Sequence, residues 1–132
     1  MTQPDQLFTT TAVQALFPPE RTHDFFEALL GDAEEGAYDI VLTYDGYEST
    51  RQTLNFSLNL HERPGRCLAC NLTYGLPEVF SRHPVINVQG MVSEIEKMLG
   101  GKMRCESWKL GHTVQKGRSL HSIPLQIEVR QQ

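Results

Sequence analysis

Two cysteines, Cys67 and Cys70, stand in the C-x-x-C spacing and form the densest chemical signal in the chain. Two thiolates at this separation can chelate one zinc ion, and a tetrahedral structural site then takes two further Cys or His ligands. The chain has no second close pair, so the remaining ligands would have to come from separate positions. The candidate metal ligands are therefore Cys67, Cys70, His61, His83 and Cys105, with His112 as a further alternative.

A thiol–disulfide pair is the second interpretation of this motif. It requires one thiol of lowered pKa, which the positive charges of Arg63 and Arg66 would favour, and a second thiol that resolves a mixed disulfide. The short segment from the motif to Pro77 leaves little length for the helix that usually carries such a pair. Position 71 is Asn71, which excludes the C-x-x-C-H pattern of covalent haem. In the third interpretation, the cysteines only pack the loop onto the core, as buried free cysteines do.

The composition predicts one globular domain. At 132 residues, with 39% hydrophobic and 21% charged residues, the chain is long enough to bury one core. It has no apolar run of the roughly 20 residues that a spanning helix needs, and its first residues lack the basic and apolar segments of a secretory signal. We therefore expect a cytoplasmic protein without membrane contact, whose three cysteines do not form a disulfide framework.

The charge of the chain is unevenly distributed. The whole chain carries a net charge of −4, which disfavours nonspecific nucleic-acid binding by the entire surface. Residues 1–50 hold ten Asp or Glu against one Arg, a net of −9, and residues 51–132 hold six against eleven Lys or Arg, a net of +5. The two halves should attract each other, either within the fold or between copies.

The first half of the chain predicts a helix followed by two strands. Apolar residues at helical spacing indicate a helix over residues 19–30, which ends at Gly31. Alternating apolar and polar residues then predict strands over residues 38–45 and 54–61. The Asp-Gly dipeptide after the first strand is typical of a two-residue turn, but pairing there would place polar residues on the apolar face. We expect a longer loop or a bulge across residues 45–52.

The second half repeats this order after a long connection. Residues 61–77 are interrupted by Gly and Pro and predict an irregular loop. A helix over residues 88–99 follows, capped by a preceding Asn and ended by a Gly-Gly pair. Strand-like alternation returns over residues 103–110, where a change of phase predicts a bulge near Glu106, and again over residues 123–129.

These elements predict an α+β fold. We expect a single domain in which an antiparallel β-sheet has two main helices packed on one face, in the order αββ-loop-αββ. In this interpretation, residues 1–17 form a partly mobile N-terminal arm and residues 18–132 form the domain. The repeated helix–strand–strand order is consistent with an internal duplication, although no residue-level repeat accompanies it.

The last third of the chain contains a basic segment with a tryptophan. Lys and Arg side chains can track phosphates while an indole stacks on a base, so this segment is a candidate for binding single-stranded nucleic acid. The alternative is a solvated sheet face with the tryptophan in the core. The residues concerned are Lys102, Arg104, Lys109, Lys116 and Arg118, with Trp108 and His112.

No catalytic motif accompanies these features. The five histidines are scattered, and no G-x-S-x-G, H-E-x-x-H or Gly-rich phosphate loop occurs. We predict a small binding or interaction domain rather than an enzyme. Its partner is another protein or a second copy, because an edge strand and opposite charges both favour self-association. The alternative is a Cys-centred protein with a zinc site or redox pair, and the further alternative is nucleic-acid binding.

Overall fold

The computed structural model describes residues 7–32, 34, 36, 38–65, 80–101 and 103–131. Along the chain, its elements are α2 (Thr10–Leu16), α3 (Pro19–Leu30), β1 (Tyr38–Glu48), β2 (Thr53–Glu62), α6 (Val88–Met98), β3 (Met103–Leu110), β4 (Val114–Gln115) and β5 (Leu120–Gln131). The predicted order of two helix–strand–strand units is confirmed, and the structure adds the short elements α2 and β4 to it.

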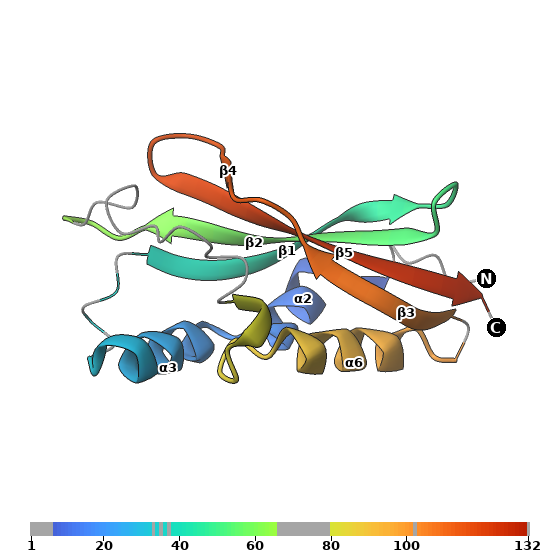
Figure 1. Cartoon of the computed structure of the whole chain (residues 1–132), viewed down its shortest axis with the longest axis horizontal. Coiled ribbons are helices and arrows are strands. Elements are labelled where there is room, and N and C mark those ends of the chain that lie inside the picture. The colour runs from blue at the N-terminus through green and yellow to red at the C-terminus, as the bar shows by residue number, and fades with distance from the viewer. Residues whose placement is uncertain are drawn as a thin grey trace.

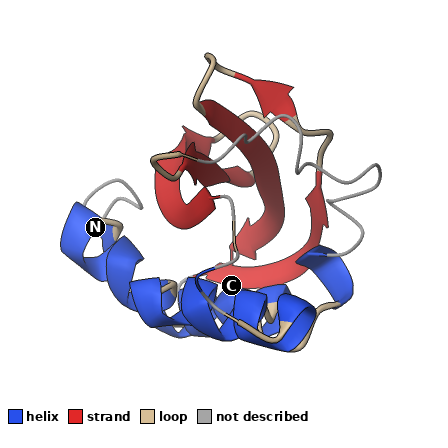
Figure 2. Ribbon diagram, turned by 90° about the vertical axis from the view of Figure 1, so that its left-hand side faces the viewer, coloured by secondary structure: helices blue, strands red, loops and turns tan. Residues whose placement is uncertain are grey.

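The strands form one antiparallel sheet in the order β1-β2-β5-β3, and β4 pairs with β5 on the side of β3. Figure 1 shows two layers, with α2, α3 and α6 together on one side of the strands. In the turned view of Figure 2, the sheet curves over the row of helices. The predicted antiparallel α+β architecture, with the helices on one face, is therefore confirmed.

The core lies between the sheet and the helices because apolar residues alternate with polar ones along the central strands. The polar positions, such as Asn55, Ser57 and Asn59 of β2, point away from the helices. Each fully buried aliphatic or aromatic side chain contributes about 1.5–3 kcal/mol, so this face of the sheet is a main source of stability. The buried hydrophobic side chains of β2 and β5 are Leu54, Phe56, Leu58, Leu60, Ile123, Leu125, Ile127 and Val129.

Both edge strands contain a bulge. The register of β1 against β2 shifts at Asp45, and the register of β3 against β5 shifts at Glu106. The extra residue keeps apolar side chains on the helix side of the strand both before and after each bulge. The turn between β1 and β2 falls at residues 49–52 and not at the Asp-Gly dipeptide, as the pattern of buried residues predicts. Both predicted irregularities are confirmed.

Local signals set the limits of the two main helices. α3 ends at Gly31, whose φ of 81° lies in the left-handed region and whose N–H donates to the Glu27 carbonyl at 2.8 Å. α6 begins after Asn87, whose side chain accepts a hydrogen bond from the Gly90 N–H at 3.1 Å. These limits agree with the prediction. No helix in the described ranges is long and apolar enough to span a membrane.

The described part of the segment before α3 belongs to the core. Val13 of α2 and the flanking Phe8 and Phe17 are buried. α2 therefore packs on the same side of β1 as α3, where it closes the core beside the edge strand. The prediction that residues 1–17 are a partly mobile arm stays untested, because residues 1–6 lie outside the described ranges.

Candidate functional site

The C-x-x-C motif lies outside the described residues. Cys67 and Cys70 fall within residues 66–79, for which the structure gives no description. The zinc, redox and packing interpretations of the pair therefore stay predictions.

Three further ligand candidates, His61, His83 and Cys105, lie in the described part, and the fold separates them. His61 is exposed on the face of the sheet that points away from the helices. Cys105 points toward α6 on the opposite face, and His83 packs against the ring of Phe25, with 4.8 Å between the ring centroids. The described residues contain no group of three His, Cys, Asp or Glu side chains that could hold a metal ion.

Cys105 sits in an environment that keeps its thiol protonated. Its Sγ lies 4.0 Å from the Val92 carbonyl oxygen, and its backbone N–H donates to Oε2 of Glu96 at 2.8 Å. Burial, and then the negative charge of Glu96, raises the pKa of the Cys105 thiol to about 11. Because the thiolate is the reactive form, this environment disfavours redox or nucleophilic chemistry at neutral pH, and the side chain packs against the core.

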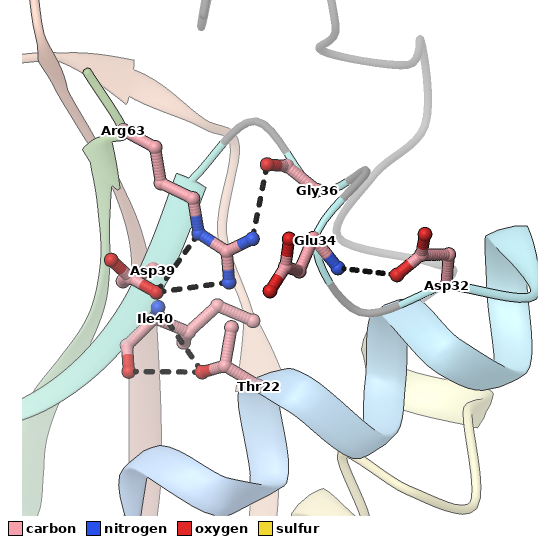
Figure 3. A network of polar contacts seen from close by, with 7 residues as sticks. All are labelled: Thr22, Asp32, Glu34, Gly36, Asp39, Ile40 and Arg63. Carbon is pink, nitrogen blue, oxygen red and sulfur yellow. Dashed lines mark hydrogen bonds and ion pairs between the residues drawn. The ribbon is translucent and has the colours of Figure 1, made fainter.

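Arg63, expected to lie close to the cysteine pair, is held by the first unit of the fold (Figure 3). Its guanidinium contacts Asp39 Oδ1 through Nε at 3.1 Å and a terminal nitrogen at 3.0 Å, and donates to the Gly36 carbonyl at 3.1 Å. It also lies over the ring of Phe26, 5.3 Å from its centroid. The side chain is 15% exposed, so Arg63 ties the end of β2 to the connector between α3 and β1.

The basic segment directs its tryptophan and two of its cations to opposite faces of the sheet. Trp108 packs against the core on the helix side, and its indole N–H donates to Gln89 of α6 at 2.7 Å. Arg104 and Lys109 point to the other face of the sheet, where they are exposed. Lys102 lies outside the described residues. Nucleic-acid binding stays a prediction. Trp108 and Lys109 both contribute to the lining of one hollow of the sheet, described below.

A groove of about 170 Å³ lies between α2, α3 and the outer edge of β1, and we call it the edge groove. Its floor is formed by three apolar residues, Phe17, Ile40 and Leu42, which are almost fully buried. A cavity of roughly 150 Å³ can hold one benzene-sized group, so the edge groove can hold one large apolar side chain. Its lining residues are Gln14, Phe17, Pro19, Thr22, His23, Asp39, Ile40, Val41 and Leu42.

Thr22 of α3 satisfies part of the strand edge in this groove. Its hydroxyl donates to the Ile40 carbonyl at 3.4 Å and accepts from the Ile40 N–H at 3.3 Å (Figure 3). The Ile40 backbone groups therefore point away from β2. Because backbone direction alternates along an antiparallel strand, the Leu42 N–H and C=O point the same way, toward an edge where no described strand pairs with β1.

The surface beside the edge groove is acidic. Glu20, Asp24 and Glu27 are exposed on one stripe of α3, at spacings of three and four residues. None of the three forms an ion pair within the described part of the chain. The neighbouring cation, Arg21, donates to a backbone carbonyl of α2 at 3.3 Å and lies 5.2 Å from the centroid of the Phe17 ring. The groove thus combines an apolar floor with a wall, α3, whose exposed stripe is negatively charged.

A larger hollow of about 360 Å³ lies on the face of the sheet that points away from the helices, near the turn between β1 and β2. Apart from Trp108, its lining side chains are polar. They bind one another: Arg51 lies 3.7 Å from Glu48, and Ser107 donates to Glu128 at 3.1 Å. These two pairs occupy half of the lining residues, which makes the hollow a weaker candidate than the edge groove.

The sequence did not reveal the edge groove. The sequence places Phe17 in the predicted N-terminal arm, and no motif near His23 singles it out. The signals that were available are the break at Pro18 and Pro19, which turns the chain between two helices, and the alternation that buries alternate side chains of β1. Neither signal indicates that α2, α3 and β1 leave a space between them.

No protein-family model, curated protein or solved structure matches the chain. The arrangement of its own residues is therefore the basis for inferring its function.

Proposed function

We propose that the protein is a small binding module, whose edge groove takes up a large apolar side chain from a cationic segment of a partner protein. The observation that carries this proposal is the apolar floor of the groove next to an acidic helix stripe without ion-pair partners. The predicted binding or interaction role is thereby given a location and a class of ligand. The protein is expected to act in the cytoplasm, as the sequence predicts.

Two interactions support binding at this place. Burying one Val, Leu or Phe side chain contributes about 1.5–3 kcal/mol. The carboxylates of Glu20, Asp24 and Glu27 attract positive charge, over a range of about 10 Å at an ionic strength of 0.1 M. Neutral and acidic segments lack the second contribution.

A selection from a phage-displayed library of random linear peptides tests the proposal on the full chain. We expect enriched peptides that carry one large apolar residue, and we expect the His23→Trp variant to lose their binding. His23 is exposed and lines the groove, so an indole at this position fills the space without disturbing the core. Binding of individual peptides is measured by fluorescence anisotropy.

The matched control is Ala28→Trp, which adds the same side chain at an exposed position of the same helix outside the groove lining. It should bind the selected peptides as the wild-type protein does. Selected peptides that bind the wild-type protein and His23→Trp equally well would contradict the proposal, as would a selection that enriches no peptide.

A further inference from the structure

We infer that the cationic segment that fills the edge groove is the β4–β5 turn of a second copy of this chain. This inference rests on the proposed function of the groove. We call residues 114–118 the basic tip, because they hold Val114 of β4 and the cations Lys116 and Arg118 of the turn that follows it. The protein then self-associates head to tail, with the basic tip of one copy in the edge groove of the next.

The basic tip has the chemistry that the groove requires. Among the described residues, Val114 is the one exposed large apolar side chain, at 44%. Lys116 and Arg118 follow on the same turn, and both are exposed. Neither cation has an ion-pair partner in the part of the chain that the structure describes. An apolar side chain flanked by unpaired positive charge is the counterpart of an apolar groove flanked by unpaired negative charge.

The tip of a given copy is not placed to fill its own groove. β4 pairs with β5 on the side of β3, whereas the edge groove lies beyond β1 at the other edge of the sheet. Figure 1 shows the turn after β4 projecting from the sheet on the side away from α3. The basic tip is therefore directed outward, where it can reach another molecule.

Pairing between two identical groove surfaces is disfavoured. It would bring the carboxylates of Glu20, Asp24 and Glu27 of two copies together, and like charges repel. Strand pairing along β1 is also hindered, because the Thr22 hydroxyl already occupies the backbone groups of Ile40. The favourable contact joins two different surfaces, and contacts of this kind produce rings or open chains rather than a closed two-fold dimer.

Sedimentation velocity of the full chain over a range of concentrations tests the inference. We expect species larger than a dimer at high concentration and monomers at about 1 M salt, where the screening length falls to about 3 Å. Two variants each disrupt one of the two contact surfaces, the edge groove or the basic tip. His23→Trp fills the groove, and Val114→Asp with Lys116→Glu inverts the tip. Each variant alone should associate more weakly than the wild type by about tenfold or more.

The decisive sample is an equimolar mixture of these two variants. The tip of the His23→Trp copy is intact, and so is the groove of the Val114→Asp, Lys116→Glu copy, so the mixture can form one contact and no more. We expect it to form a dimer and nothing larger. Ala28→Trp and Lys97→Glu are the controls for added bulk and for charge reversal at exposed helix positions, and both should assemble as the wild type does.

Three results would overturn the inference: a wild-type chain that stays monomeric at every concentration, variants that assemble as the wild type does, or a mixture that grows beyond the dimer. In the first case the peptide selection separates the two proposals. Peptides whose binding is lost in His23→Trp would leave the groove as a site for another protein, whereas their absence would remove both the inference and the proposed function.

Discussion

The two helix–strand–strand units, α3–β1–β2 and α6–β3–β5, repeat one plan with different charges. Each has an edge strand with a single bulge, and each bulge carries a carboxylate on the face away from the helices. In the second unit, the Glu106 carboxylate contacts Arg104 at 3.0 Å and Arg130 at 3.6 Å. In the first unit, the Asp45 carboxylate accepts hydrogen bonds from the hydroxyls of Thr43 and Ser57.

The two bulges reflect on a small scale the division of charge in the sequence. The hydroxyl partners of Asp45 are neutral, so its charge adds to the negative field of the first unit. The two guanidinium partners of Glu106 more than balance its charge, so the second unit stays positive at the bulge of its edge strand. The backbone arrangement tolerates both solutions because a carboxylate at a bulge can accept hydrogen bonds from either kind of donor.

The units also protect their sheet edges in the same manner. A side chain from the helix of each unit binds the backbone of that unit's edge strand: Thr22 binds Ile40 of β1, and Glu96 binds Cys105 of β3. Exposed edges of this kind favour pairing with other chains unless they are covered. The Thr22 cap is buried, at 1% exposure, whereas the Glu96 bond is only partly buried.

Phe25→Ala should produce the largest effect, because Phe25 joins the two units. Its ring, fully buried in α3, lies 5.4 Å from the ring of Phe80 and 4.8 Å from that of His83, both in the segment that leads into α6. Truncating a buried Phe costs about 3–5 kcal/mol, which urea unfolding monitored by circular dichroism measures. The exposed neighbour Glu27→Ala should change stability by no more than about 0.5 kcal/mol. Equal effects of the two substitutions would contradict the joining role of Phe25.

Thr22→Val tests the buried edge cap. The substitution keeps the shape of the side chain but leaves the Ile40 N–H and C=O without the hydroxyl, and an unsatisfied buried polar group costs about 1–3 kcal/mol. We expect a loss of about 2 kcal/mol in the free energy of unfolding. Glu96→Gln, which keeps an oxygen acceptor for the Cys105 N–H, should cost less than about 1 kcal/mol. A larger loss in the free energy of unfolding for Glu96→Gln than for Thr22→Val would contradict the greater contribution of the Thr22 contact.

Alkaline pH should weaken the two edge strands through different side chains. Burial raises the pKa of the Cys105 thiol from 9.0 to about 11, and burial also raises the pKa of Tyr38 above its ordinary 10.0. In both cases the folded state favours the protonated form. The resulting stability is complete below the ordinary pKa and is lost as the pH rises through the raised value. Stability should therefore fall as the pH rises from about 9 toward 11.

Two variants separate these contributions. Cys105→Ala should flatten the loss of stability that begins near pH 9, and Tyr38→Phe should flatten the loss that begins near pH 10. Chemical unfolding at a series of pH values measures both. If the wild type and the two variants lose stability in parallel, the pH dependence arises elsewhere in the chain.

Much of the fold was predictable because its signals are local. Strict alternation identifies β2 from its own residues, the glycine at position 31 ends α3 through its own φ, and the buried face of β2 outweighs the Asp-Gly turn signal. The contacts that define the edge groove are different in kind. The bond between Thr22 and Ile40 and the ion pair between Arg63 and Asp39 join residues 18 and 24 positions apart. No local pattern indicates such partners, so the site emerges only from the assembled layers.

The smallest effect concerns the bulge carboxylates themselves. The hydrogen bond from Arg104, supported by the charges of Arg104 and Arg130, lowers the pKa of Glu106, although a slight loss of hydration opposes the shift. The stability that Glu106 contributes is therefore present above its ordinary pKa of 4.5 and is lost as the pH falls through the lowered value. Because the pair is exposed, salt should weaken this contribution.

Glu106→Gln and Asp45→Asn should therefore differ in how their effects on the free energy of unfolding respond to salt. The effect of Glu106→Gln on unfolding should shrink when the salt concentration rises from about 0.1 M to about 1 M, because salt screens the attraction to two cations. The effect of Asp45→Asn should stay the same, because its partners are hydroxyls. An equal response to salt would mean that the cationic partners of Glu106 and the hydroxyl partners of Asp45 do not set the salt dependence of the two carboxylates.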